Sequence, residues 1–385
     1  MSEPLRALLR ASLRDALARL DPARLVHDAL PPLPPRRARV RVIAAGKAAV
    51  AMAEGALARW PARIEDALAI TVDPGADRLH SPSDPRLRIR VAAHPLPDAR
   101  SVAAAEEALL RAGDLGAEDL LVALISGGAS SLLAAPSPGI SLELKRSLLA
   151  TLLDAGAPIR AVNLVRRHLS RVKGGRLAAA ALPARVLTLI VSDVIDGALH
   201  DIGSGPSVPD PTTVEEARAV LRRYAPEEAA LIALDESLKP DAPISLLNLA
   251  ATFPAAARIR AKILADPAAL AQAVAASLER AGLRAQAGAP EEGEASTMVE
   301  RRLAQARALA PGEALVIACE PTLRLPPTRG RGGRAGWIAL AALRDLPEGV
   351  ALLCAASDGA DGSSGGAGAL VMREDAARST SEAID

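Results

Sequence analysis

The stretch Arg185–Thr213 reads RVLTLIVSDVIDGALHDIGSGPSVPDPTT and decides the fold of the chain. It opens with the apolar run Val186–Val191, which predicts a buried strand of a parallel sheet. Asp193 follows at once, so a carboxylate is expected at the strand's carboxyl end, where ligands bind in open α/β sheets. The glycines and prolines of 203–211 favour a rigid turn whose backbone approaches an anion. The alternative for these residues is a helix cap followed by an ordinary turn.

Strands and helices alternate around this stretch, which predicts an α/β protein with a mainly parallel, Rossmann-like sheet covered on both faces. The composition shifts after Thr213, and a run punctuated by Pro and Asp follows to about Leu247. We therefore expect a larger N-terminal α/β domain over 1–245 and a smaller C-terminal α/β domain over 246–385. In the latter, a short strand Thr322–Leu325 is expected to pair with 314–318 as a hairpin.

Composition excludes several function classes. A chain of 385 residues with 50% hydrophobic and 1% aromatic residues supplies two cores but little stacking surface, and its net charge is +1. No nucleic-acid partner is expected. The N-terminal 22 residues predict an amphipathic helix and no signal peptide, and no run is long enough to span a membrane. The expectation is a cytoplasmic protein whose two cysteines are buried thiols.

Two Gly-containing turns after predicted strands are candidate anion sites. Gly46-Lys47 follows the strand 39–45 and precedes a helix, so helix N–H groups and an ammonium lie together, although the spacing is not that of a Walker A loop. Ser126–Ser131, SGGASS, follows the strand 120–125 in the same way. The alternatives are a Gly-Lys pair without a role and a tight turn with capping serines.

Three further clusters carry charge. Cations crowd 161–181, where a turn near Gly174-Gly175 is expected to break the helix; they indicate either an anionic substrate or a solvated face. Arginines alternate with glycines in 328–334, which matches phosphate geometry or a disordered basic loop. Asp358 and Asp361 follow a predicted strand and could hold Mg²⁺ or occupy a plain turn.

Seven of these blocks occur together and in order. They are AAGKAA (44–49), HPLPD (94–98), SGGASSLL (126–133), NLVRRHLSRVKGGRLA (163–178), VSDV with SGPSVPDPTT (191–194 and 204–213), GRGGR (330–334) and SDGADG (357–362). On them the chain resembles the glycerate 2-kinase family, also labelled hydroxypyruvate reductases. Its members combine an N-terminal glycerate kinase domain with a C-terminal MOFRL domain, with the active site in the cleft between the two.

The resemblance implies an ATP- and Mg²⁺-dependent kinase that phosphorylates D-glycerate at the 2-hydroxyl, giving 2-phosphoglycerate, and that is a monomer or homodimer. It implies that Lys47 and Arg334 stabilise charge on the phosphoryl group and the carboxylate, with Asp193 beside the reacting hydroxyl as base or through the metal. The substrate- or phosphate-binding residues would be Ser126, Gly127, Gly128, Ser130, Arg166, Lys173, Ser204 and Gly205. The nucleotide or metal side would comprise Glu320, Gly332, Gly333, Asp358 and Asp361.

The chain departs from the family pattern at several points. Asp196-Gly197-Ala198 replaces Gly-Asp-Asp, Ala335-Gly336-Trp337 replaces Asn-Gln-Glu, ACEPT (318–322) replaces Gly-Gly-Glu-Thr-Thr, and a Gly- and Thr-rich loop and final strand are expected beyond Asp385. One alternative is therefore a catalytically impaired homologue, truncated at its end, that only binds glycerate or nucleotide. A hydroxypyruvate reductase is a weaker alternative, because no G-x-G-x-x-G follows any predicted strand.

Overall fold

The computed structural model describes residues 2–32, 37–73, 84–227, 258–323 and 330–378. They fall into two compact units, one of Pro22–Ala265 and one of Met1–Asp21 with Asp266–Asp385. The expected domain boundary at 245/246 lies outside the described residues. The N-terminal helix, which that division assigns to the first domain, packs in the unit formed by the C-terminal residues.

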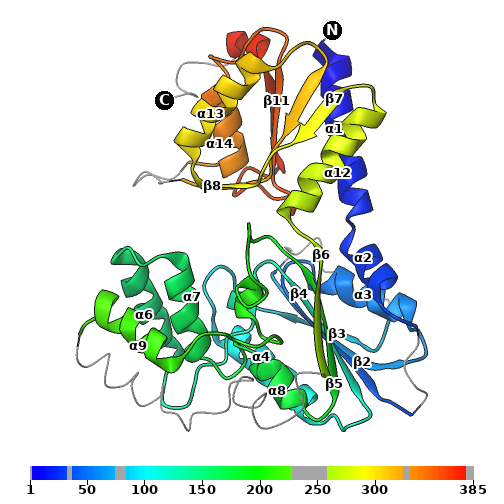
Figure 1. The fold of residues 1–385 in the computed structure, drawn as a ribbon, viewed down its shortest axis with the longest axis vertical. Helices are drawn as coiled ribbons and strands as arrows, with labels where there is room; N and C mark the ends of the chain where they lie inside the picture. Colours follow the sequence, from blue (N-terminus) through cyan, green and yellow to red (C-terminus); the bar gives the residue numbers. More distant parts are fainter. Residues whose placement is uncertain (1, 33–36, 74–83, 228–257, 324–329, 379–385) are drawn as a thin grey trace. The chain divides into compact units, whose positions relative to one another are not determined.

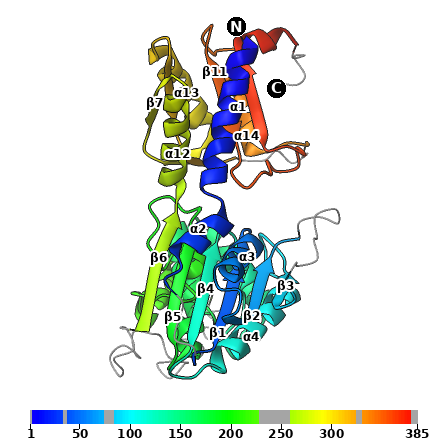
Figure 2. The ribbon, with the colours of Figure 1, turned by 90° about the vertical axis from the view of Figure 1, so that its right-hand side faces the viewer.

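The larger unit is built on a six-stranded parallel sheet with the order β3-β2-β1-β4-β5-β6 (Figures 1 and 2). Its strands are β1 (Val40–Ala45), β2 (Ile64–Thr71), β3 (Leu87–Val91), β4 (Leu120–Ser126), β5 (Arg185–Val191) and β6 (Ile259–Ala265). The predicted α/β class and parallel sheet are confirmed. Strand β6 was not predicted, because it lies at the sheet edge and its exposed Arg260 and Lys262 interrupt the apolar run.

Helices cover both faces of this sheet because alternate strand residues point in opposite directions. Val42 packs with Met52 and Trp60 on the face of α2 and α3, whereas Ile43 packs with Ala105 on the face of α4, α5 and α8. The helices are α2 (Pro22–Ala29), α3 (Ala49–Arg59), α4 (Ala99–Gly113), α5 (Ala129–Leu132) and α8 (Arg176–Ala181).

Three helices form a separate apolar cluster in the same unit (Figure 1). They are α6 (Leu142–Asp154), α7 (Ile159–His168) and α9 (Val214–Tyr224). Ser141 and Thr213 cap α6 and α9 with their hydroxyl groups. As predicted, the cation-rich segment is broken at Gly174 and Gly175, which adopt φ of +58° and +82° before α8 begins.

The smaller unit contains three two-stranded sheets and four helices of the described residues. The helices are α1 (Ser2–Arg19), α12 (Pro267–Arg280), α13 (Ala295–Ala308) and α14 (Arg334–Ala342), followed by a 3₁₀ turn, Arg373–Arg378. The strands are β7 (Arg284–Ala287), β8 (Glu291–Glu294), β9 (Glu313–Val316), β10 (Cys319–Thr322), β11 (Ala351–Ala355) and β12 (Gly368–Met372).

The strand pairing corrects the expected hairpin. β9 pairs in parallel with β7, and β10 pairs in parallel with β8, so the consecutive strands β9 and β10 do not pair with each other. The end of the expected strand at Leu325 lies outside the described residues. Strands β7, β8 and β12 were not predicted; β8, EEGE, carries no apolar pattern at all.

Two expectations from the sequence, the N-terminal helix and the two buried thiols, concern residues of this unit. Arg6 on α1 donates to Asp375 at 2.6 Å, which fixes the helix to the C-terminal 3₁₀ turn. Both cysteines are free, as expected, but Cys319 is exposed and Cys354 only half-buried, so the expectation of two buried thiols was wrong. Among the described residues, no helix is both long and apolar enough to cross a membrane.

Candidate active site

The strand order places a topological switch at the centre of the larger sheet. From β1 the chain proceeds outward through β2 and β3, then returns to β4 on the other side of β1. Loops that leave the carboxyl ends of β1 and β4 diverge at such a point and leave room for a ligand. The predicted Gly46-Lys47 and Ser126–Ser131 segments follow these two strands.

These two loops are bonded directly to each other. The Lys47 N–H donates to the Gly127 carbonyl at 2.8 Å, and the Ala48 N–H donates to the Ser126 hydroxyl at 3.1 Å. Gly46 has φ of +129°, and a Cβ there would lie 2.1 Å from Ser126 Oγ. Only glycine permits this approach, so the sequence fixes Lys47 beside the loop after β4.

Gly127 and Gly128 bring three further side chains to the same place. A Cβ on Gly127 would lie 2.2 Å from Asp193 Oδ2, so the carboxylate rests against the glycine backbone. A Cβ on Gly128 would contact His94 Cδ2 at 3.2 Å and Lys47 Cγ at 3.6 Å. Lys47, His94 and Asp193 are all exposed there. The structure thus brings together an ammonium, an imidazole and a carboxylate from the ends of β1, β3 and β5.

Ser130 is the centre of a second group of predicted residues. Its hydroxyl lies 2.8 Å from the Ser204 hydroxyl, 3.4 Å from Arg166 Nη1 and 3.3 Å from Lys173 Nζ. Both cations can only donate, so Ser130 Oγ accepts from them and directs its own proton to Ser204. Arg166 and Ser130 are half-buried, whereas Lys173 is buried. Arg166 is therefore the cation that a ligand can reach.

The loop of Ser204 and Gly205 can offer a ligand the Ser204 hydroxyl, whereas the backbone N–H groups of both residues are already bonded within the loop. The N–H groups of these residues donate to the carbonyls of Asp201 and Ile202, at 3.1 and 2.9 Å. Their own carbonyls accept from Gly174 and Gly175. Ser204 has φ of +62°, a conformation uncommon for a residue with a side chain, and this directs its hydroxyl toward Ser130.

Lys173 is buried and holds the loop after β4 in place through hydrogen bonds. Its ammonium donates to the carbonyl oxygens of Ser130 and Leu133, at 2.5 and 2.8 Å. Burial and the neighbouring Lys145 and Arg166 hold the pKa of Lys173 well below its usual range. The side chain reaches the loop from behind, so it positions Ser130 more directly than it contacts a ligand.

Two buried cations near this group, Arg167 and Lys145, were not assigned from the sequence. Arg167 is only 2% exposed and pairs with Asp210 and Asp201, at 3.0 and 3.1 Å. Lys145 on α6 is equally buried. The signal was present for Arg167, inside the RRHLSR block, but Lys145 lies in an ordinary amphipathic pattern with no motif around it.

In the smaller unit, Asp361 occupies the position where an anion had been expected. Its oxygens accept from the N–H groups of Ala335 and Gly336 at 2.9 and 2.7 Å, and it is 4% exposed. A Cβ on Gly333 would collide with it. The carboxylate therefore caps α14 and supplies the negative charge that the helix N-terminus favours.

The other predicted residues of this unit are at its surface. Arg334 pairs with Glu320 at 2.6 Å, and both side chains are about half exposed. Such a pair exchanges readily with another anion. Gly332 contacts the Ser363 hydroxyl through its N–H, and Asp358 is exposed and accepts from the Ala360 N–H at 3.2 Å. No group of three or more His, Cys, Asp or Glu side chains suited to a metal occurs among the described residues.

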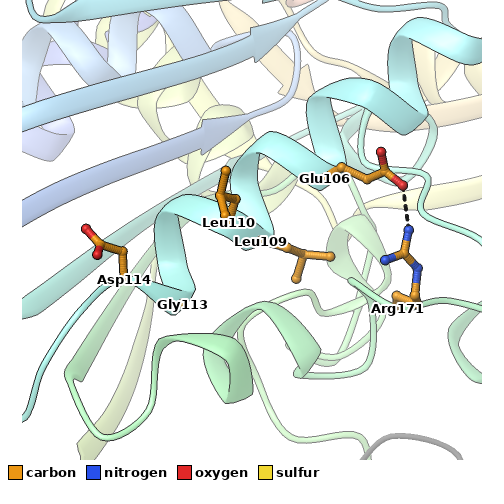
Figure 3. A pocket seen from close by; sticks show the side chains of 6 residues that line it. All are labelled: Glu106, Leu109, Leu110, Gly113, Asp114 and Arg171. Carbon is orange, nitrogen blue, oxygen red and sulfur yellow. Dashed lines mark hydrogen bonds and ion pairs between the residues drawn. The ribbon is translucent and has the colours of Figure 1, made fainter.

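A hollow of about 630 Å³ lies on the carboxyl-terminal half of α4 and is bordered by the Glu106–Arg171 pair (Figure 3). Its other lining residues are Leu109, Leu110, Gly113 and Asp114. Asp114 pairs with Arg41 at 2.6 Å, at the amino-terminal part of β1. The hollow is therefore near the opposite end of the sheet from Lys47 and Asp193, and it contains no predicted site residue.

Comparisons with known proteins identify the relatives of this chain. The "Domain of unknown function (DUF4147)" model matches residues 8–239, and the MOFRL family model matches 313–385. A D-glycerate 2-kinase of Thermotoga maritima is 33% identical over 96% of this chain and 86% of its own length. A protein of Agrobacterium vitis provisionally named hydroxypyruvate reductase is 37% identical over 99% of this chain and 86% of its own length.

A solved structure shows the same fold. The crystal structure of glycerate kinase from Thermotoga maritima superimposes with a TM-score of 0.82 at 30% identity, over 97% of this chain and 88% of that one. Both family models, the relatives and the solved structure point the same way. The chain belongs to the glycerate 2-kinase family.

Proposed function

We propose that this protein transfers the γ-phosphoryl group of ATP to the 2-hydroxyl of D-glycerate, giving 2-phosphoglycerate and ADP. The observation that carries the proposal is the convergence of Lys47, Asp193 and the Gly127-Gly128 backbone at the switch point of the sheet. The family's glycerate kinase names support the substrate.

The reaction needs positioning and charge neutralisation more than covalent chemistry. A bond forms between the 2-hydroxyl oxygen and the γ-phosphorus, and the bond from that phosphorus to the β–γ bridging oxygen breaks. The hydroxyl proton leaves to a base. In this assignment Lys47 stabilises the transferring phosphoryl group, and Asp193 lies beside the hydroxyl as base or metal ligand. The role of Arg334, which pairs with Glu320 within the smaller unit, stays a prediction.

Arg166, Ser130 and Ser204 are assigned to the glycerate carboxylate. Arg166 supplies a guanidinium, which matches carboxylate geometry, and Asn163 holds it by accepting from Nη1 at 2.9 Å. Ser130 and Ser204 supply hydroxyls, and Lys173 fixes Ser130 from behind.

The residues present fit Mg²⁺–ATP. Mg²⁺ in kinases is held by one or two carboxylates together with phosphate oxygens and water, so a preformed cluster of protein ligands is not required. Asp193 is an exposed carboxylate against the glycine loop and is the residue we assign to it. When bound, the ion neutralises charge on the phosphates. Asp361 is assigned no metal role, since both of its oxygens cap α14.

The two alternatives give different results in one set of experiments. Purified protein is assayed for ADP release with D-glycerate, for NADH consumption with hydroxypyruvate, and for binding of glycerate and ATP by calorimetry. We expect ADP release that falls about 10³-fold in Lys47→Met, because one charge that stabilises the transition state is removed.

The matched control is Lys262→Met, an exposed lysine on β6, which should keep full activity. Binding without ADP release would favour a homologue that only binds its ligands. NADH consumption without ADP release would favour the reductase. Either result contradicts the proposed kinase activity.

A further inference from the structure

Lys145 is a buried lysine that the proposed chemistry does not use. It lies on α6 and is 2% exposed, and its ammonium donates to the carbonyl of Leu169 at 2.8 Å, at the carboxyl end of α7. The described residues include no carboxylate in an ion pair with it. An ammonium buried in this way loses hydration that one carbonyl does not replace.

The hydrogen bond to Leu169 does not explain why a lysine is present. The same carbonyl also accepts from the Ser137 N–H at 3.2 Å, so it would stay bonded without the ammonium. An apolar side chain of similar length would fill the same space without the cost of burying a charge. Burying this lysine therefore lowers the free energy of unfolding, and its hydrogen bond to Leu169 does not account for that cost.

The charges that act on Lys145 are cationic. Burial, and after it repulsion by Arg166 on α7 and Arg176 on α8, lowers the pKa of Lys145 to about 7. Lys173, in the segment between these two helices, and Lys145 repel each other in the same way. The carboxylates on α9, which also packs on α6, are engaged elsewhere: Glu215 pairs with Arg218, and Glu216 accepts from Thr213.

Two of these cations contact the group assigned to the substrate carboxylate. Arg166 and Lys173 both donate to Ser130, and Arg166 is on the helix whose end holds Lys145. Without a ligand the positive charges repel one another. A bound anion would offset this repulsion and raise the pKa of the Lys145 amine, because an opposite charge nearby favours the protonated form of an amine.

We propose that Lys145 is a positioning residue for the acidic substrate: its ammonium, held at the end of the helix that carries Arg166, is a buried counter-charge for the carboxylate that binds Arg166. The inference rests on the proposed function for the identity of that carboxylate. It requires that binding is linked to protonation of Lys145. Above pH 7 the protein then takes up a proton as the anion binds, and affinity falls as pH rises.

Calorimetry of D-glycerate binding to the wild-type protein, in two buffers of different ionisation enthalpy, tests this directly. At pH 8 we expect between about half and one proton to be taken up per glycerate bound, and almost none at pH 5.5, where Lys145 is already protonated. Equal heats in both buffers at pH 8 would overturn the inference.

The variant Lys145→Met gives a second readout. We expect KM for glycerate to rise about tenfold at pH 7, with kcat changed less than about threefold, and the proton uptake at pH 8 to be lost. Arg146→Met, an exposed cation on the same helix, should behave as wild type. If Lys145 were merely structural, Lys145→Met would instead lower the melting temperature and leave KM and proton uptake unchanged.

Failure of the inference is distinguishable from failure of the proposed function. If wild-type protein turns glycerate over but Lys145→Met has the same KM and the same proton uptake, only the inference is wrong. If wild-type protein neither binds nor phosphorylates glycerate, the proposed function is wrong. Sulfate, an anion that does not itself titrate between pH 5.5 and 8, then serves as the probe in the same two buffers, and binding without proton uptake contradicts the role of Lys145.

Discussion

Substitution of Gly127 by alanine tests how closely the proposed site depends on the approach of two loops. The added Cβ would lie 2.2 Å from Asp193 Oδ2 and 2.6 Å from its Cγ, whereas ordinary contact begins at 3.4 Å. Gly127 does not have a left-handed backbone, so the collision with Asp193 is the main effect. The carboxylate must move by about 1 Å, which at a reacting centre costs on the order of 10²-fold in rate.

The assay is steady-state phosphorylation of glycerate, with thermal unfolding measured in parallel. We expect Gly127→Ala to lower kcat about 100-fold, with little loss of stability because Asp193 is exposed and can turn away. The matched control is Gly113→Ala, where the nearest atom to an added Cβ is 3.8 Å away. It should keep wild-type kcat.

A double substitution identifies the cause of the loss. If Gly127→Ala acts by displacing Asp193, then in an Asp193→Ala background it should lower kcat hardly further. An undiminished kcat in Gly127→Ala, or losses that multiply in the double variant, would refute the reasoning.

Three further predictions concern stability. Asp361→Ala removes two bonds to the start of α14 and should lower the free energy of unfolding by about 1–2 kcal/mol in chemical denaturation, whereas Asp358→Ala should change it by less than about 0.5 kcal/mol. Asp210→Ala leaves buried Arg167 with one carboxylate fewer and should cost about 3 kcal/mol; a loss below about 1 kcal/mol would show that Asp201 suffices. Burial lowers the pKa of Lys145 from its usual 10.5 to about 7 in the folded protein, so the unfolded chain binds more protons and stability should rise by about 2 kcal/mol from pH 7 to pH 9. Lys145→Met should remove that part of the rise in denaturant titrations at the two pH values.

The central strands and their loops could be predicted because local signals and tertiary structure agree there. Val186–Val191 is apolar throughout and lies between neighbours in the sheet, and Gly46 and Gly127 mark close approaches that only glycine permits. A buried parallel strand and a glycine turn both leave a trace in a few consecutive residues.

Features that depend on distant residues could not be predicted in this way. The pairing of β9 with β7 and of β10 with β8 is not encoded in either strand alone, so adjacency in sequence suggested the wrong hairpin. Asp361 was expected to face a ligand, because its spacing does not reveal that α14 begins beside it. Lys145 carries no local signal, since its surroundings are supplied by α7 and α8.

The position of phosphorylation is the most direct test of the central claim. Purified protein is incubated with ATP, Mg²⁺ and D-glycerate, and enolase is added with or without phosphoglycerate mutase. The account predicts phosphoenolpyruvate with enolase alone, since enolase accepts 2-phosphoglycerate, and none with Lys47→Met. Phosphoenolpyruvate that forms only with the mutase present would show transfer to the 3-hydroxyl and contradict it, as would no product under either condition.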